Sequence, residues 1–499
     1  MASVVTIARV VPRKASAGGD WIAAAVLLVA LLATRAIFFG DPVADYDEQL
    51  YSVIGWRMTQ GDWPYVDLWD RKPLGLFAIF ALAHALFGPG AIAFQLLAGA
   101  AAFAGALLVY LLAREQVDRA SAVVAGVLYL LFLALYGSQS GQSEAFHTPM
   151  MLAMLWLVRD WRRSDAPRRV ALAMLIGGLA LQVKYTVLPQ CLFFGAWALL
   201  GEWRMGARLP RLARRAALFA LLGVLPTVLV ALFYLWRGHF DEFWFANFVS
   251  FFDRVSPPGG RLRHDLVIAY IPLALMVFPG LYAAFRMNPP REWGAYWLHA
   301  AWLLAALATV LLPGTVYGYY YAALVAPAIL TALPIIDRKG PLRFVPAVLL
   351  LLFAAQLYNP AGRYAGSLAE RRVEARLSSA IAPYVGSEHD CLYVFDGPTV
   401  LYRTTGSCLP SRFVYPDHLN NALETPALGV SQTDEVARIL ANHPGVIVTA
   451  SRAVTPQQPD NLARVRDATG RNYRPLITMS LHDRAITAWV RRDLARPRP

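Results

Sequence analysis

Apolar segments of about twenty residues recur along the first 360 positions of this 499-residue chain. A helix of that length is long enough to cross the hydrocarbon core of a bilayer, which is roughly 30 Å thick. The chain is 57% hydrophobic and 16% charged, whereas about a quarter of the residues in an average soluble domain are charged. The sequence therefore predicts an α-helical polytopic membrane protein.

The apolar pattern predicts roughly eleven membrane-spanning helices within a membrane domain over residues 1–359. Their expected bounds are 21–39, 91–113, 120–136, 146–160, 170–183, 186–201, 216–236, 266–286, 293–312, 320–336 and 343–358. The basic residues Arg9, Arg13 and Lys14 precede the first apolar run, and no small-residue cleavage site follows it. We therefore interpret that run as a membrane helix, not as a cleaved signal.

A further apolar segment, 73–88, is short for a membrane span. If it does not cross, the arginine-rich loops 159–169 and 202–215 lie with the N-terminus on the cytoplasmic side, as the positive-inside rule requires. The segments 137–145 and 313–319, which contain no Lys or Arg, then lie outside. If it does cross, the bias is inverted. We therefore expect 73–88 to be an interfacial or re-entrant helix on the outer face.

The net charge of +13 gathers in part on these loops. Positive charge on cytoplasmic loops fixes topology, so we expect membrane lipid and no nucleic acid as a partner. A second surface helix is expected in the loop 237–265, or alternatively an extension of the preceding helix. Its aromatic residues recur at helical spacing and suit the headgroup boundary: Phe240, Phe243, Trp244, Phe248, Phe251 and Phe252.

Residues 360–499 are more polar and predict a small soluble α/β domain on the outer side. Strand-like runs occur at 391–395, 445–450 and 485–490, and a helix capped by Ser431 is expected over 431–441. Two of the three cysteines, Cys391 and Cys408, lie in this domain and can form a disulfide in an oxidising compartment. The third, Cys191, lies in an apolar run and is expected to be a small core residue.

The first outer loop, 40–90, contains an unusual cluster of seven acidic residues within thirty positions. They are mixed with Trp and Tyr and comprise Asp41, Asp45, Asp47, Glu48, Asp62, Asp67 and Asp70. Solvation of an outer loop is one explanation. An active site is the other, because ionisable groups at membrane depth tend to be functional.

The motif Asp47-Glu48-x-x-Tyr51, followed by Lys72-Pro73-Leu74, resembles the first outer loop of the C-type (GT-C) glycosyltransferase superfamily. The resemblance is strongest to the branch that contains protein O-mannosyltransferases and the aminoarabinose transferases of lipid A. In that pattern an Asp-Glu pair opens an outer juxtamembrane helix. A Lys-Pro-Pro-Leu or His-Pro-Pro-Leu segment opens a second one before the next span.

This sequence departs from that pattern at two positions. Leu74 stands where the second proline usually lies, and Arg71 stands where the aminoarabinose branch usually has Glu, which argues against that particular sugar. Weaker resemblances extend over about residues 20–360. They involve the acid Glu144 in a second outer loop, Lys184 after an apolar run, and the sequence Tyr319-Tyr320-Tyr321, in which Tyr319 replaces a histidine. The C-terminal domain adds no recognisable catalytic motif.

The resemblance implies a sugar donor linked to a polyprenyl phosphate. Such a transfer needs a carboxylate that takes the proton of the acceptor hydroxyl and fixed cations that hold the departing phosphate. By resemblance Asp47 is the base, with Asp45 as the alternative. Glu48 would orient Asp47 or contact a sugar hydroxyl, unless it only supplies negative charge at a helix N-terminus.

Lys72 is the first candidate for the donor phosphate, because a lysine is a compact point charge for phosphate. Arg57, Lys184 and Arg71 are further candidates. Snorkelling at a helix end is the structural alternative for Lys72 and Lys184, and a polar helix face is the alternative for Arg57. Glu144, Tyr51, Tyr319 and Tyr320 are candidate substrate-binding residues, and a structural role is the alternative for Glu144.

No zinc motif and no P-loop lysine occur in the sequence, and no metal-binding residues are assigned. A divalent cation, Mg²⁺ or Mn²⁺, stays possible because acidic loops recruit such ions. We thus expect an inverting membrane glycosyltransferase that acts on a cell-envelope glycan, lipid or protein. A flippase of lipid-linked sugars is one alternative. A polysaccharide polymerase or ligase is another, favoured by the arginines at 254–263. The composition suggests a bacterial inner membrane with the active face toward the periplasm.

Overall fold

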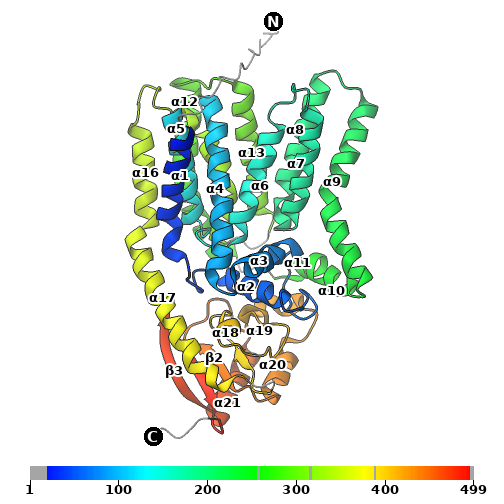
Figure 1. Ribbon diagram of the computed structural model, residues 1–499, viewed down its shortest axis with the longest axis vertical. Coiled ribbons are helices and arrows are strands. Elements are labelled where there is room, and N and C mark those ends of the chain that lie inside the picture. The colour runs from blue at the N-terminus through cyan, green and yellow to red at the C-terminus, as the bar shows by residue number, and fades with distance from the viewer. Residues whose placement is uncertain (1–19, 256–258, 314–316, 387–388, 495–499) are drawn as a thin grey trace.

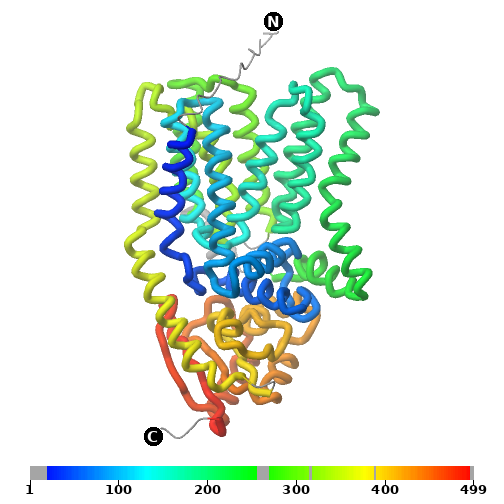
Figure 2. The backbone as a smooth tube through the Cα atoms, viewed as in Figure 1, coloured from blue at the N-terminus to red at the C-terminus, as the bar shows by residue number. Residues whose placement is uncertain are grey.

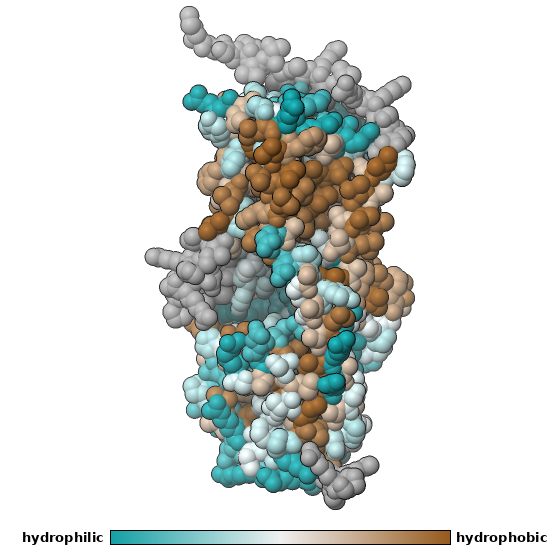
Figure 3. Space-filling model, turned by 90° about the vertical axis from the view of Figure 1, so that its left-hand side faces the viewer, coloured by the Kyte–Doolittle hydropathy of each residue, from teal (hydrophilic) through white to brown (hydrophobic). Residues whose placement is uncertain are grey.

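The computed structural model describes residues 20–255, 259–313, 317–386 and 389–494 (Figure 1). A bundle of long helices forms its upper part, and short helices and a mixed sheet form its lower part (Figures 1 and 2). Figure 3 shows a band of apolar side chains across one face of the upper part, with polar residues above and below it. The band is the surface that a bilayer would cover.

The upper helices follow the predicted apolar segments closely. They are α1 (Asp20–Arg35), α4 (Ala91–Gln116), α5 (Arg119–Leu135), α6 (Ser143–Val158), α7 (Ala166–Leu181), α8 (Leu188–Arg204), α9 (Leu209–Trp236), α12 (Gly259–Arg286), α13 (Trp293–Leu311), α14 (Ala322–Thr331), α15 (Leu333–Ile336) and α16 (Val345–Tyr358). Within the described residues, six helical segments are long and apolar enough to cross a membrane by length and composition.

Several helix bounds differ from the predicted ones for local reasons. Helix α6 begins at Ser143, three residues early, because the side chain of Gln142 caps it by accepting a hydrogen bond from the Ser143 amide. Helix α9 begins at Leu209 with Pro210 in its first turn, a position that proline favours. The predicted helix 320–336 is divided at Ala332 into α14 and α15.

The short helices lie across the lower end of the bundle. They are α2 (Tyr46–Met58), α3 (Leu74–Phe87), α10 (Phe240–Trp244) and, after a π-helical turn at Phe245–Val249, α11 (Ser250–Asp253). Helix α3 packs beside α2 and does not cross the bundle (Figure 1). Gly238, with φ +79°, separates α10 from α9, so this aromatic segment is not an extension of α9. The arginine-rich loops α6–α7 and α8–α9 lie at the opposite, upper end.

Residues 360–494, here called the C-terminal unit, begin with α17 (Pro360–Ile381). A four-stranded sheet follows in the order β1 (Leu392–Val394), β2 (Val446–Ala450), β4 (Arg484–Arg491) and β3 (Tyr473–Leu481). Strands β1 and β2 are parallel and the other pairs are antiparallel. The unit also contains α18 (Leu401–Thr404), α19 (Pro416–Asn420), α20 (Gln432–Ala441) and α21 (Pro459–Asn472). Ser431 caps α20, as predicted.

The C-terminal unit shares its core with the juxtamembrane helices. One buried apolar cluster joins Leu50 and Ile54 of α2 to Leu392 and Val446 of the sheet. The amide of Val400 also donates a hydrogen bond to the side chain of Gln49 on α2, at 3.4 Å. A disulfide joins Cys391 to Cys408. The sheet is therefore attached firmly to the lower end of the bundle.

Candidate active site

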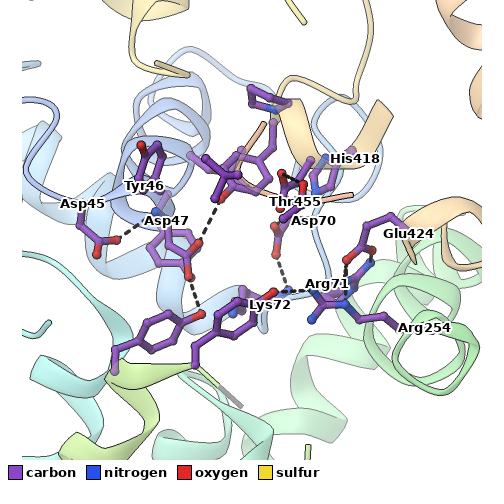
Figure 4. A pocket seen from close by; sticks show the side chains of 18 of the residues that line it. Asp45, Tyr46, Asp47, Asp70, Arg71, Lys72, Arg254, His418, Glu424 and Thr455 are labelled. Atoms are coloured by element: carbon purple, nitrogen blue, oxygen red, sulfur yellow. Dashed lines mark hydrogen bonds and ion pairs between the residues drawn. The ribbon is translucent and has the colours of Figure 1, made fainter. Parts of the chain in front are cut away.

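A cavity of about 410 Å³ lies between the lower end of the bundle and the C-terminal unit. Its lining comes from the start of α2, the turn before α3, the turns before α8 and α14, the segment after α11, and the loops around α19 and β2. Figure 4 shows its polar side chains converging from these elements. Segments that are hundreds of residues apart in the sequence thus meet at one membrane boundary.

Asp47, in the first turn of α2, is held by hydroxyl groups from three parts of the chain. Its Oδ2 accepts hydrogen bonds from Tyr51 at 3.3 Å and from Tyr319 at 3.0 Å, and its Oδ1 accepts one from Tyr415 at 3.3 Å. The side-chain Nε2 of Gln142 also donates a hydrogen bond to Oδ2, at 3.3 Å. These donors orient a carboxylate that faces the cavity (Figure 4).

Asp45 caps α2, since its Oδ1 accepts a hydrogen bond from the Asp47 amide at 2.9 Å. The side-chain Nε2 of Gln142 donates a hydrogen bond to the same oxygen at 3.2 Å. This one side-chain amide therefore bridges the carboxylates of Asp45 and Asp47. Burial, together with the neighbouring Asp47 carboxylate, raises the pKa of Asp45 to about 7. At neutral pH the Asp45 side chain is therefore partly protonated. Its position at the start of α2 is explained by its role as the helix cap.

Lys72 projects into the same cavity from the turn that precedes α3. Its Nζ lies 5.9 Å from the ring centre of Tyr51, and no carboxylate of a described residue lies within ion-pair distance of it. Burial favours the neutral amine, but Asp47 and Asp70 outweigh it and raise the pKa of Lys72. The side chain is therefore an ammonium group at neutral pH.

Asp70 fixes the turn that presents Lys72. Its Oδ1 accepts a hydrogen bond from the Lys72 amide at 2.7 Å, and its Oδ2 lies 3.7 Å from Nε2 of His418. Burial opposes ionisation of Asp70, but the His418 contact outweighs it and lowers the pKa of Asp70.

Lys184 also lines the cavity, but its ammonium group is paired. It forms a buried ion pair with Glu144 of α6, and its Nζ lies 4.0 Å from the ring centre of Tyr320. Glu144 also accepts a hydrogen bond from the Ser143 hydroxyl at 2.9 Å. This glutamate lies behind Lys184 and is not part of the cavity lining.

Two arginines at the cavity share one carboxylate of the C-terminal unit. The two Nη atoms of Arg71 donate hydrogen bonds to the Glu424 carboxylate, and Nε of Arg254 lies 2.7 Å from Glu424 Oε1 (Figure 4). Arg254 also donates a hydrogen bond to the Tyr317 hydroxyl at 3.0 Å. Burial opposes ionisation of Glu424, but Arg71 and Arg254 lower the pKa of Glu424 below its ordinary value.

Like Glu144, two further candidate residues do not line the cavity. Glu48 points to the other side of α2, is fully buried, and accepts a hydrogen bond from the Gly141 amide at 2.5 Å. Burial and Asp45 raise the pKa of Glu48 well above its ordinary value. Arg57 lies at the far end of α2 and pairs with Asp62. Neither contributes to the cavity lining.

The structure brings Asp47, Asp45, Lys72, Arg71, Lys184, Tyr51, Tyr319 and Tyr320 together in the cavity, as the sequence analysis expected for one site. It adds residues that sequence reasoning did not select, notably Tyr415, Asp417, His418 and Glu424 of the C-terminal unit. The single sequence offered one weak signal for them, a concentration of Tyr, Asp and His at 415–418. Arg254, from the arginine-containing segment 254–263, also lines the cavity.

Among the described residues, no group of three or more His, Cys, Asp and Glu side chains is arranged to hold a metal ion. The Asp45 and Asp47 carboxylates are bridged by the side-chain amide of Gln142, which donates a hydrogen bond to each. A requirement for Mg²⁺ or Mn²⁺ stays a prediction.

Comparison with known proteins places this geometry in context. A family model described as dolichyl-phosphate-mannose-protein mannosyltransferase matches residues 71–230. No curated protein sequence matches the chain. The crystal structures of ArnT from Cupriavidus metallidurans, one bound to undecaprenyl phosphate and one in the apo state, each match with a TM-score of 0.62 and 16% sequence identity. Each alignment covers 97% of this chain and 100% of ArnT.

At 16% identity the likeness to ArnT concerns the fold, and it extends over the membrane helices and the C-terminal unit alike. The family model covers the segment that begins at Arg71 and Lys72 and runs into α9. The chain thus has the fold of ArnT, and over residues 71–230 it is similar to a family of membrane glycosyltransferases.

Proposed function

We propose that this enzyme transfers a sugar from a polyprenyl-phosphate carrier to a hydroxyl group of a cell-envelope glycan, lipid or protein. The observation that carries the proposal is that one cavity holds both groups: the Asp47 carboxylate, which three tyrosine hydroxyls orient, and the half-buried Lys72 ammonium group. A general base and a phosphate-binding cation are the two groups that this transfer needs.

The reaction follows from these two residues. The acceptor hydroxyl attacks the anomeric carbon while Asp47 takes its proton. The bond between that carbon and the phosphate oxygen breaks, and the phosphate leaves with the bonding electron pair. Lys72 stabilises the negative charge that develops on the departing phosphate. Attack from the face opposite the phosphate inverts the anomeric configuration, as the family resemblance implies.

The other cations at the cavity are less available than Lys72. Arg71 and Arg254 are engaged with Glu424, and Lys184 is engaged with Glu144. We propose that Arg254 and Arg71 assist Lys72 only when a donor phosphate competes with the Glu424 carboxylate for them. The complex of ArnT with undecaprenyl phosphate supports a polyprenyl phosphate as the carrier.

We also propose that the cavity faces the periplasm of a bacterial inner membrane. The arginine-rich loops lie at the end of the bundle opposite the cavity, which favours a cytoplasmic position for that end. The disulfide between Cys391 and Cys408 on the cavity side suits an oxidising compartment. The N-terminus would then be cytoplasmic and the C-terminal unit periplasmic.

The proposal is tested by reconstituting the protein in liposomes with a panel of radiolabelled polyprenyl-phosphate sugars and a crude envelope extract. We expect label to enter the extract with the wild-type protein. The matched variant Asp47→Asn keeps the size of the side chain and should lose transfer while its thermal unfolding is unchanged. Full transfer by the Asp47→Asn variant would show that Asp47 is not the base. If no sugar is transferred but labelled lipid crosses the bilayer faster than in empty liposomes, the flippase alternative replaces the proposal.

A further inference from the structure

The floor of the cavity is formed by polar side chains of the C-terminal unit that the transfer chemistry does not use. We call the set Asp396, Asp417, Asn420, Thr455, Gln457 and Arg484 the polar floor. It lines the same cavity as Lys72, Arg71 and the tyrosines of the candidate site, and Figure 4 labels one of its members, Thr455. Figure 3 shows that the surface is hollowed between the apolar band and the polar lower part of the molecule.

Hydrogen bonds fix the orientation of the groups on the polar floor. Arg484 Nη1 donates to Asp396 Oδ1 at 2.7 Å, and Gln457 Nε2 donates to Asp396 Oδ2 at 3.0 Å. The Thr455 hydroxyl donates to Asp417 Oδ1 at 3.0 Å. Each of these carboxylate oxygens can accept a further hydrogen bond. The floor is thus a preorganised set of acceptors and donors.

Two buried atoms on the polar floor, Oδ1 of Asn420 and Nε of Arg484, have no hydrogen-bond partner among the described residues. Asn420 is 3% exposed, and its Nδ2 donates to the Phe395 carbonyl at 2.7 Å. A buried amide oxygen without a donor is costly.

The charge of the polar floor differs from that of the opposite wall. Its guanidinium group, on Arg484, is paired with Asp396, and Asp417 adds a second carboxyl group. Burial raises the pKa of Asp417 to about 6. At neutral pH most of these side chains are therefore ionised and accept hydrogen bonds without donating any. A phosphate or carboxylate ligand finds no unpaired cation here. A neutral group with several hydroxyls, each a donor and an acceptor, fits this floor.

The base connects the floor to the reaction. Asp47 Oδ2 contacts Tyr51 and Tyr319, which belong to the membrane side, whereas Oδ1 contacts Tyr415 of the C-terminal unit. The donor carrier must approach from the membrane side, because its polyprenyl tail lies in the bilayer. The acceptor hydroxyl must reach Asp47 from the other side.

We propose that the polar floor is a binding subsite for a neutral sugar residue of the acceptor, which it orients with one hydroxyl toward Asp47 Oδ1. The inference rests on the proposed function for the role of Asp47. It specifies the acceptor: the enzyme extends a glycan at an uncharged sugar, and the C-terminal unit selects that sugar. Thr455, Gln457 and Asn420 are then specificity-determining residues.

The inference is tested by binding, which requires neither donor nor turnover. Saturation-transfer NMR on the full-length protein in detergent would compare neutral manno-, gluco- and galactotriosides with their monophosphates. We expect at least one neutral trisaccharide to bind and its monophosphate to bind more weakly. Thr455→Val and Gln457→Leu should each weaken binding roughly tenfold, the effect of one lost hydrogen bond. Thr478→Val, on the exposed face of β3, is the matched control and should bind as the wild type does.

Four results would overturn the inference, and three of them concern binding of the trisaccharides alone. They are no binding of any neutral trisaccharide, preferential binding of the monophosphates, and equal binding by the floor variants when their thermal unfolding matches the wild type. The Asp47→Asn variant should still bind the trisaccharide. A failure of transfer in the reconstituted assay therefore contradicts the proposed function alone, whereas a failure of binding contradicts the polar floor alone. Displacement of the trisaccharide by a polyprenyl-phosphate sugar that serves as donor would reassign the floor to the donor sugar and also overturn the inference.

Discussion

The hydroxyl of Tyr415 donates a hydrogen bond to the carboxylate of Asp47 across 368 positions of sequence. The proposed base is therefore oriented partly by the membrane helices and partly by the C-terminal unit. A cavity of about 410 Å³ lies around this contact. The arrangement makes the C-terminal unit a component of the site and not only a cover for it.

Removal of the Tyr415 hydroxyl should slow the chemical step. Tyr415→Phe keeps the ring but frees one oxygen of Asp47, so the base samples unproductive orientations, and we expect kcat to fall about tenfold. The measurement is kcat for sugar transfer in liposomes. Tyr473→Phe removes a hydroxyl that bonds to the Pro444 carbonyl away from the cavity, and it serves as the control. An unchanged or higher kcat in Tyr415→Phe would show that this contact does not position the base.

Replacement of Lys72 should affect the donor and not the fold. Its ammonium group pairs with no carboxylate of a described residue, so Lys72→Met leaves no carboxylate without its ion-pair partner. We expect thermal unfolding close to that of the wild type and a loss of transfer by a factor of about 100 or more, as found for single electrostatic groups at reacting phosphates or oxyanions. Transfer within a factor of about three of the wild type would exclude Lys72 from phosphate binding.

Replacement of Lys184, unlike that of Lys72, should lower the stability of the fold. Lys184→Met leaves Glu144 as a buried, unpaired carboxylate, which costs about 3–5 kcal/mol of stability. The double variant Lys184→Met with Glu144→Gln removes both charges and should recover most of that loss. Thermal unfolding in detergent measures both effects. A single variant as stable as the wild type would show that the ion pair is not structural.

The membrane helices and the outer helix at 73–88 could be predicted because apolar length and loop charge carry the signal along the chain. Helix α17 was not predicted as a helix, because its sequence is polar and continues directly from α16 after Asn359. Strand β3 was also missed. It pairs only with β4, and its mixed burial leaves no clear alternation of apolar and polar residues.

The candidate site was predictable only where its residues form a local motif. Asp47 and Lys72 belong to one loop whose pattern resembles a known superfamily, so the sequence placed them together. Glu424 reaches Arg71 across 353 positions, and no spacing rule connects residues so far apart. The single sequence also gave no reason to separate Lys184, which is paired, from Lys72, which contacts no described carboxylate.

Glu424 should make stability depend on pH in the acidic range. Because Arg71 and Arg254 lower its folded pKa, its stabilising effect is fully present above the ordinary pKa of 4.5 and is lost as the pH falls through the lower folded value. Glu424→Gln should therefore unfold at a lower temperature than the wild type at pH 7, and the difference should shrink below about pH 4. The measurement is a series of thermal scans from pH 7 to pH 3. A difference that does not change with pH would contradict the pairing.

The disulfide should contribute to stability and report on the compartment of the C-terminal unit. Cys391 and Cys408 are separated by 17 positions, and closing a loop of that length stabilises a fold by about 3 kcal/mol in the chain-entropy model. Paired replacement by serine should lower the unfolding temperature, and reductant should lower it only in the wild type. Alkylation of the denatured protein from intact cells should modify Cys191 alone before reduction and all three cysteines after it. Modification of all three without reductant would mean that the pair is reduced in the cell, and it would argue against a periplasmic position for the cavity.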